Sequence, residues 1–277
     1  MKIVDGNKAC SSVAYLFSEI CSIYPITPSS PMAENIDYLT HTDKKNIFND
    51  KPTVVEMESE LGAAGALHGA LLSGSLASTY TASQGLLLMI PNLYKIAGEC
   101  LPGVIHVAAR SIATHALSIF GDHSDIYSAR MTGCCMLASS NVYDAQNLAA
   151  VAHLSAIKGS LPFIHFFDGF RTSHELNTIK KLPEEKLLPL VDKNALESFK
   201  KTALLSDLNY GTSQTEDVYF QITESRNEFY DKMPDIVNEY MTNINEIMGT
   251  SYKPFNYYGS ENAKYIIIAM GSVNDTV

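Results

Sequence analysis

The chain has 277 residues, 46% of them hydrophobic and 18% charged, and its formal net charge is −10. This composition is typical of a globular protein with a substantial core, and the length suits roughly two domains or one large α/β domain. The acidic balance argues against a nucleic-acid partner. No apolar run approaches the roughly 18 residues that span a bilayer, and the N-terminus lacks the pattern of a signal peptide. We therefore expect a cytoplasmic protein without membrane contact.

Strand and helix patterns alternate over the first 170 residues. Near-continuous apolar strands separated by helices predict a mostly parallel sheet covered on both faces, which is a three-layer, doubly wound α/β fold. The first helix is predicted to begin near Pro31 with Ser30 as its N-cap, and the third to be interrupted or begun near Pro91. The strands are predicted at 20–24, 53–56, 75–81, 103–109, 134–138 and 161–167, and the later helices at 58–72, 83–97 and 143–157.

The loop after the first of these strands is the most informative segment, Tyr24-Pro-Ile-Thr-Pro-Ser-Ser-Pro-Met-Ala-Glu34. Its prolines restrict the backbone, so we expect the loop to hold one shape. Stiff loops between a strand and a helix N-terminus are where α/β proteins place ligands. The pattern alone also allows an ordinary strand-to-helix connection.

The chain changes character after this alternating region. Residues 177–215 are rich in Lys, Glu and Leu and predict a long excursion over the surface. A helix is predicted at 234–248, and residues 264–272 predict an apolar strand followed by a Gly-Ser turn, which is the opening of a new α/β unit. We therefore expect one domain over residues 1–256 and the truncated start of a second α/β domain over residues 257–277.

The cysteines and histidines do not form a metal-binding motif. None of the five cysteines belongs to a Cys-x-x-Cys pair, and the eight histidines lack the spacing of metal ligands. Scattered cysteines in a chain without a signal peptide are typical of reduced, mostly buried thiols. We therefore expect no iron–sulfur, zinc or histidine metal site in this chain.

Three residues at predicted strand ends are candidates for a site that binds an acidic small molecule. Glu60 precedes a run of small residues that could bury its carboxylate and raise its pKa. Arg110 ends an apolar strand, where a guanidinium can bind a carboxylate with two hydrogen bonds. Thr27 offers a hydroxyl at the same sheet edge. The alternatives are an acidic cluster, Glu56 to Glu60, that only stabilises a helix N-terminus, and a salt bridge from Arg110 to Asp122 or Asp125.

Several long motifs then occur in an order that resembles the N-terminal domain of pyruvate:ferredoxin (flavodoxin) oxidoreductases. The resemblance covers essentially the whole chain and is specific, because motifs of this length do not recur in order by chance. The motifs are Tyr24-Pro-Ile-Thr-Pro-Ser-Ser, Glu56-Met-x-Ser-Glu60, Thr81-Ala-Ser-Gln-Gly-Leu-Leu-Leu-Met-Ile-Pro91, Ala109-Arg-Ser, His115-Ala-Leu-Ser-Ile-Phe-Gly-Asp-His123, Phe166-Phe-Asp-Gly-Phe-Arg-Thr-Ser-His-Glu175, Asp217-Val-Tyr-Phe-Gln221 and Ala269-Met-Gly-Ser272.

This resemblance implies the pyrimidine-binding half of a thiamine diphosphate-binding fold. Glu60 matches the glutamate that hydrogen-bonds the aminopyrimidine ring and so promotes ionisation of the thiazolium carbon. Arg110 and Thr27 match the residues that hold the pyruvate carboxylate. The implied reaction is oxidative decarboxylation of pyruvate to acetyl-CoA and CO2 in anaerobic metabolism, with coenzyme A as the acetyl acceptor. Electrons pass through iron–sulfur clusters to ferredoxin or flavodoxin, and the cofactor is the electron sink.

The sequence departs from the family pattern in several places. Cys134-Cys135 replaces an expected Phe-Ala pair, Glu58 replaces a glutamine, and residues 200–214 match poorly. The family's diphosphate- and Mg2+-binding domain and its cluster cysteines do not occur in this sequence. We therefore expect the chain to be inactive alone and to need the remaining domains, in a complete enzyme that is a homodimer. Two alternatives stay open, a non-catalytic truncated remnant or subunit, and the same chemistry on another 2-oxoacid.

Overall fold

The computed structural model describes residues 1–204 and 213–277, and its centre is a parallel six-stranded sheet in the order β3-β2-β4-β5-β7-β6. Every neighbouring pair is parallel, as the alternating sequence pattern predicts. A separate antiparallel pair, β1 (Lys2–Val4) with β8 (Asn177–Ile179), was not predicted. The six strands are β2 (Ile20–Ile23), β3 (Thr53–Glu56), β4 (Ala77–Thr81), β5 (Val104–Ala109), β6 (Cys135–Ala138) and β7 (Phe163–Asp168).

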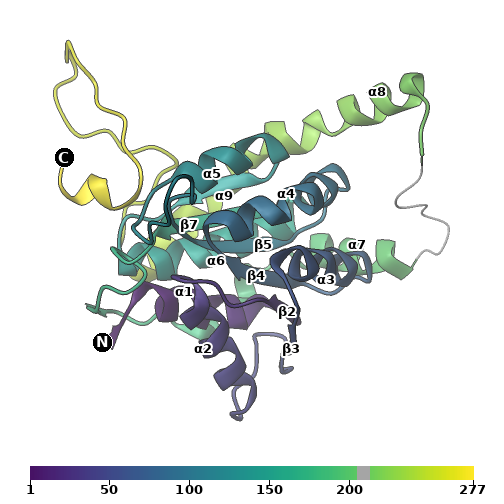
Figure 1. Cartoon of the computed structure of the whole chain (residues 1–277), viewed down its shortest axis with the longest axis horizontal. Coiled ribbons are helices and arrows are strands. Elements are labelled where there is room, and N and C mark those ends of the chain that lie inside the picture. The colour runs from purple at the N-terminus through teal and green to yellow at the C-terminus, as the bar shows by residue number, and fades with distance from the viewer. Residues whose placement is uncertain (205–212) are drawn as a thin grey trace.

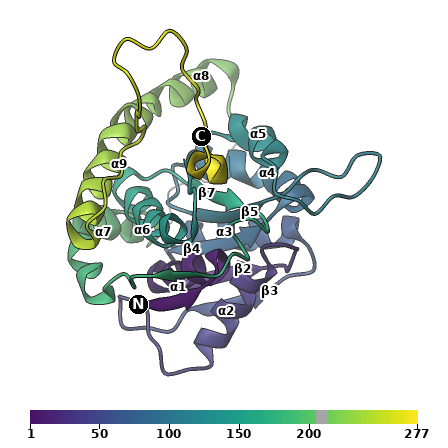
Figure 2. The same ribbon diagram turned by 90° about the vertical axis from the view of Figure 1, so that its left-hand side faces the viewer.

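Helices cover both faces of the sheet and confirm the three-layer arrangement (Figure 1). One face packs against α1 (Gly6–Phe17), α2 (Ser30–Thr40), α6 (Val142–Gly159) and α9 (Asn227–Met248). The other face packs against α3 (Glu60–Leu72), α4 (Ser83–Gly98) and α5 (Ser124–Ala129). Figure 2 shows α6 and α9 on the opposite side of the strands from α4 and α5.

Alternation along the central strands explains why both faces are apolar. On β5, Ile105 and Val107 face the α3–α4 layer, whereas Ala108 faces the α1–α6 layer. All of β5 is buried, and each large apolar side chain buried in this way contributes about 1.5–3 kcal/mol. His106 breaks the apolar pattern of the strand, because its imidazole is fully buried on the α1–α6 side.

One predicted N-cap and one predicted helix interruption are wrong, and local geometry explains both. Helix α2 has Ser29 rather than Ser30 as its N-cap, because the N–H groups of Ser29 and Ser30 already bond the carbonyl of Ile26 in a turn that leads into the helix. Helix α4 runs through Pro91 without interruption. Pro91 is exposed, so water can bond the carbonyl that lacks a backbone partner.

The segment after residue 176 has more regular structure than predicted. It contains β8, two 3-10 turns and helix α7 (Lys193–Leu204), whose Phe199 packs against the core. Helix α8 (Glu216–Ser225) follows, and α9 starts at Asn227, seven residues before the predicted start. Of the poorly matching residues 200–214, positions 205–212 lie outside the described residues.

The strand predicted at 264–272 is absent. Tyr265, Ile266 and Ile268 are 91%, 67% and 87% exposed, in a segment that projects from the body (Figures 1 and 2). A strand needs a neighbouring backbone, and none of the described strands lies beside this segment. The chain returns to the sheet at Ser272, whose N–H and hydroxyl both bond the carboxylate of Asp168.

Within the described ranges, no helix combines the length and the apolar character that a membrane span requires.

Candidate active site

The three candidate residues lie at the carboxyl edge of the sheet. Thr27 follows β2, Glu60 follows β3, and Arg110 follows β5, with β4 between β2 and β5. The sheet reverses its winding at β2 and β4, since β3 extends it on one side and β5 on the other. Parallel α/β sheets bind ligands outside such a reversal.

The Arg110 side chain connects two of these loops. Its Nη1 donates to the backbone carbonyl of Thr27 at 2.7 Å, and its Nη2 donates to Oε1 of Gln84 at 3.1 Å. The residue is 7% exposed, and its Nε is buried without a hydrogen-bond partner among the described residues. Burial lowers the pKa of Arg110, and the charges of Asp125 and Glu60 oppose that effect. The guanidinium is thus a buried cation that retains an unused donor.

The local salt bridge considered for Arg110 is not formed. Asp125 accepts the backbone N–H of Arg110 rather than a guanidinium proton, and Asp122 accepts the N–H of Ser124. No carboxylate among the described residues lies within 4.0 Å of the guanidinium nitrogens. The charge of Arg110 therefore has no direct partner within the described part of the chain.

The buried carboxylate of Asp125 holds the backbone beside the site through three hydrogen bonds, a role that the sequence did not reveal. Its Oδ2 accepts the N–H groups of Ser83 at 2.8 Å and Arg110 at 3.0 Å, and Oδ1 accepts that of Ile126 at 2.7 Å. Ser83 has a φ of +51°, which non-glycine residues rarely adopt. Burial raises the pKa of Asp125, whereas the hydrogen bonds oppose the shift. One buried carboxylate thus fixes both the start of α4 and the backbone of Arg110.

Glu60 differs from its acidic neighbours in burial. Glu56 and Glu58 are exposed, whereas Glu60 is 7% exposed at the first position of α3. The hydroxyl of Ser59 caps this helix by accepting the N–H of Gly62 at 3.1 Å. A cap is therefore supplied without Glu60, and no described residue donates a hydrogen bond to the Glu60 carboxylate. The interpretation of the cluster as helix stabilisation alone does not explain this burial.

Gly85 leaves the space that Glu60 occupies. A Cβ at position 85 would lie 2.9 Å from Oε1 of Glu60 and 2.5 Å from Oγ1 of Thr81. The Thr81 hydroxyl is buried and has no hydrogen-bond partner among the described residues. The backbone of α4 can therefore approach Glu60 closely at Gly85, because no side chain lies between them. The Glu60 carboxylate and the Thr81 hydroxyl, both beside Gly85, can each still form hydrogen bonds.

Gln84 and Thr27 complete the surroundings of Arg110. The side chain of Gln84 accepts from Arg110 and donates to the carbonyl of Ala113 at 3.3 Å, so it orients the guanidinium. Thr27 is exposed, and it contacts Arg110 through its carbonyl rather than its hydroxyl. The hydroxyl therefore remains available to a ligand. The sequence pattern did not single out Gln84, although it lies in one of the matched motifs.

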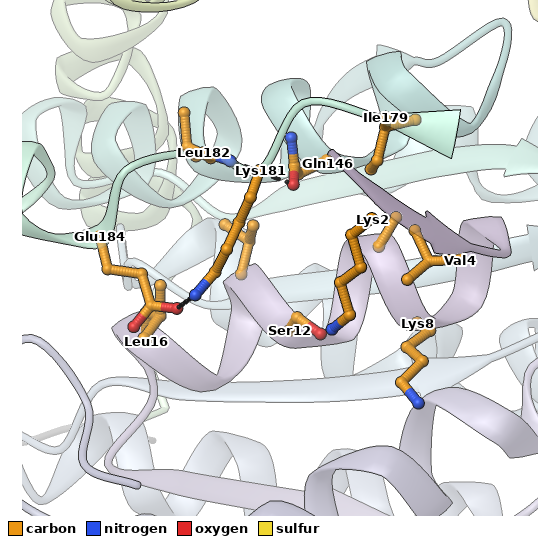
Figure 3. A pocket seen from close by; sticks show the side chains of 12 residues that line it. Lys2, Val4, Lys8, Ser12, Leu16, Gln146, Ile179, Lys181, Leu182 and Glu184 are labelled. Atoms are coloured by element: carbon orange, nitrogen blue, oxygen red, sulfur yellow. Dashed lines mark hydrogen bonds and ion pairs between the residues drawn. The ribbon is translucent and has the colours of Figure 1, made fainter. Parts of the chain in front are cut away.

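Two hollows elsewhere in the molecule contain none of these residues. A hollow of about 30 Å³ lies between α1 and the β1–β8 pair, with Lys2, Lys8 and Lys181 at its rim (Figure 3). It has room for roughly one water molecule. A larger hollow of about 650 Å³ lies between α4 and the junction of α8 with α9.

Comparison with known proteins supports the resemblance. Residues 12–242 match a family model described as pyruvate flavodoxin/ferredoxin oxidoreductase, thiamine diphosphate-binding. The chain is 57% identical over 279 residues to pyruvate-flavodoxin oxidoreductase of Klebsiella pneumoniae, covering 100% of this chain and 24% of that protein. It is 52% identical to pyruvate:ferredoxin oxidoreductase of Moorella thermoacetica, covering 97% and 23%. The chain spans about a quarter of the length of these curated relatives.

A solved structure shares the fold. The structure of 2-oxoglutarate:ferredoxin oxidoreductase from Magnetococcus marinus superposes with a TM-score of 0.62 at 18% identity, covering 84% of this chain and 45% of that one. The predicted three-layer α/β architecture is thereby confirmed. The low identity carries no information on substrate.

Proposed function

Because this chain belongs to the pyruvate flavodoxin/ferredoxin oxidoreductase family, with its match in the thiamine diphosphate-binding domain, we propose that it forms the pyrimidine-binding half of a 2-oxoacid oxidoreductase site. The reaction we propose is oxidative decarboxylation of pyruvate to acetyl-CoA and CO2. The observation that carries this proposal is the convergence of Glu60, Arg110 and Thr27 at one sheet edge.

The surroundings of Glu60 fit the aminopyrimidine of thiamine diphosphate. The residue is buried, its carboxylate has no hydrogen-bond donor in the described part of the chain, and Gly85 leaves open space beside it. A carboxylate in this position can accept a hydrogen bond from a ring nitrogen and hold a proton there. When bound, the cofactor supplies the carbanion and the electron sink that decarboxylation needs.

Arg110 fits the role of carboxylate holder for the substrate. Gln84 and the carbonyl of Thr27 fix two edges of its guanidinium, and the buried Nε retains an unused proton. The Thr27 hydroxyl can add a hydrogen bond to the same carboxylate. A buried cation without a carboxylate partner among the described residues favours an anionic ligand over a neutral one, because the carboxylate of the ligand supplies the missing counter-charge.

The other cofactors require groups that the described residues do not supply. Within those residues, the one cluster of His, Cys, Asp or Glu close enough to hold a metal consists of Cys10, His106 and His165, without a carboxylate. Mg2+ prefers oxygen ligands and clusters prefer several thiolates. We therefore propose that other domains supply Mg2+ and the iron–sulfur clusters. We also propose that those domains contact coenzyme A and ferredoxin or flavodoxin, and that the complete enzyme is a cytoplasmic homodimer.

We also propose that the chain contains two parts. Residues 1–256 form the pyrimidine-binding domain, and residues 257–277 begin a second α/β domain. The exposed apolar run from Tyr265 to Ile268 supports this division, because such a run needs neighbouring strands to cover it.

A chimera tests the proposal. This chain replaces the matching segment of the Klebsiella pneumoniae relative, and pyruvate-dependent reduction of flavodoxin is measured. We expect activity, its loss in Glu60→Gln, and its retention in the matched control Glu58→Gln, which changes an exposed glutamate. A chimera that assembles with its cofactors but reduces no flavodoxin would contradict the proposal, and faster reduction with another 2-oxoacid would reassign the substrate.

A further inference from the structure

Three side chains that are far apart in sequence converge inside the α1–α6 layer. Cys10 on α1, His106 on β5 and His165 on β7 are all 0% exposed. Sγ of Cys10 lies 3.1 Å from Nδ1 of His106 and 3.7 Å from Nδ1 of His165, and the two Nδ1 atoms are 3.0 Å apart. The sequence prediction of no histidine metal site rested on spacing along the chain, which cannot reveal this cluster.

The opposite nitrogens of both imidazoles already have partners. Nε2 of His106 lies 3.1 Å from Nε2 of His153, and Nε2 of His165 lies 2.8 Å from the hydroxyl of Ser139. Partners of this kind fix the ring orientation and the tautomer of a metal-bound histidine. If each Nε2 carries the proton and donates it, both Nδ1 lone pairs point at the space beside Cys10. Two such lone pairs repel each other unless a proton or a cation lies between them.

We propose that Cys10, His106 and His165 form a trigonal binding site for one soft metal ion, Cu(I). Thiolates favour soft ions such as Cu(I), imidazoles also bind copper, and a trigonal set of one Cys and two His is an arrangement that copper sites use. A trigonal ion with bonds of about 2.0–2.3 Å holds its ligand atoms roughly 3.5–3.7 Å apart. The observed separations of 3.0–3.7 Å therefore need the side chains to move apart by up to about 0.6 Å.

Charge favours a monovalent ion over zinc. When Cu(I) binds, the Cys10 S–H bond breaks, the S–Cu bond forms and one proton leaves to solvent, without any change in oxidation state. The thiolate and Cu(I) then sum to zero charge. A divalent ion would leave one positive charge in a fully buried site, where the side-chain partners in the described residues are only Ser139 and imidazoles.

Refolding in the presence of the ion tests the site, since the cluster is closed to solvent in the folded chain. The chain is refolded without oxygen from denaturant, with Cu(I) supplied as its coloured bathocuproine complex. We expect the folded chain to remove one Cu(I) from the chelator, and X-ray absorption to show one sulfur and two nitrogen ligands. The site does not depend on the proposed function, because none of its residues lies in the candidate active site.

Variants separate this site from other thiols. Cys10→Ala is expected to weaken binding by at least about 100-fold, and Ser139→Ala, which removes a partner of His165, by about 10- to 100-fold. Cys21→Ala is the matched control, because Cys21 is also 0% exposed but bonds Ser78 and Tyr80 instead. Circular dichroism confirms that each variant has refolded.

Two outcomes would overturn the proposal. One is native refolding of the unaltered chain without retention of Cu(I), or with retention equal to that of Cys10→Ala. In that case the cluster is a hydrogen-bonded core only. The other is tight, Cys10-dependent binding of Zn(II) in preference to Cu(I), which would contradict the charge argument.

Discussion

Nη1 of Arg110 donates to the backbone carbonyl of Thr27 across 2.7 Å, although 83 residues separate the two in sequence. The bond joins the loop after β2 to the end of β5 and orients the guanidinium along the sheet edge. It involves no side-chain atom of Thr27. The arginine is therefore positioned by the main chain on one side and by Gln84 on the other.

Replacement of Arg110 by lysine tests this geometry. Lysine keeps the charge but loses the planar fork, so we expect KM for pyruvate in the chimera to rise about 10- to 100-fold, since hydrogen bonds to charged groups contribute about 1.5–3 kcal/mol. Steady-state kinetics over a range of pyruvate concentrations provide the measurement. Arg130→Lys, at an exposed arginine bonded to the Tyr127 carbonyl, is the control. Equal effects of the two changes would contradict the role of Arg110.

Replacement of Gly85 by alanine tests the approach of α4 to Glu60. The added methyl group would meet Thr81 and Glu60 at less than 3.0 Å. We therefore expect the free energy of unfolding of the chain to fall by about 1–3 kcal/mol and the affinity of the chimera for thiamine diphosphate to be much weaker. Urea denaturation and calorimetry measure the two effects. Gly65→Ala in α3, where nothing lies within 4 Å, should stabilise the chain by up to about 1 kcal/mol. A Gly85→Ala variant as stable as Gly65→Ala would contradict the steric argument.

Asp125→Asn tests the buried carboxylate beneath the site. Asparagine has the same shape but only one acceptor oxygen, so at least one of three N–H donors loses its partner. We expect a loss of about 1–3 kcal/mol in unfolding free energy, together with lower affinity for pyruvate. Asp122→Asn is the control, because Asp122 is exposed. An Asp125→Asn variant of normal stability would show that the three hydrogen bonds contribute little.

The contact between Ser272 and Asp168 is expected to depend on pH. His123 donates from Nε2 to Oδ1 of Asp168 at 2.6 Å, and this hydrogen bond raises the pKa of His123 above 6.5. Burial alone would raise the pKa of Asp168, but the bonds from His123 and Ser272 lower it below 3.8. The stabilisation that protonated His123 gives to this contact is complete below pH 6.5 and is lost as pH rises through the raised pKa of His123. The stabilisation that ionised Asp168 gives is present above pH 3.8 and is lost as pH falls through the lowered pKa of Asp168.

Hydrogen exchange measures this dependence. Residues 271–277 should be best protected between about pH 4 and 6.5 and less protected at pH 8, with reference values of 3.8 and 6.5 for the two groups. His123→Asn should remove the change above pH 6.5. Protection that rises steadily to pH 8 in the unaltered chain would contradict the ion pair.

The sheet and most helices could be predicted because strand and helix periods are local properties of the sequence. The strand at 264–272 could not, because an apolar run specifies a strand only when a neighbouring backbone is present. The pair of β1 with β8 joins residues about 175 apart and left no local signal. Pro91 was misinterpreted because proline tolerance depends on exposure, which the sequence does not state.

The candidate site was predicted in part. Glu60, Arg110 and Thr27 stood out as polar residues at the ends of apolar strands, and the structure brings their loops to one edge. Asp125 was considered only as an ion-pair partner, because a bond to a backbone N–H has no sequence pattern. The Cys10 cluster was missed for a related reason, since its members come from separate elements that only the tertiary fold brings together.

Because Arg110 is held by the main chain at position 27, the position of its guanidinium does not depend on the side chain at that position. Since the carbonyl holds Arg110, a substitution at position 27 can alter the shape and polarity of the sheet edge without moving the guanidinium that we propose as the carboxylate holder. Under the proposed function, single substitutions at this one exposed position would change substrate preference, while recognition of the acid group would be inherited unchanged.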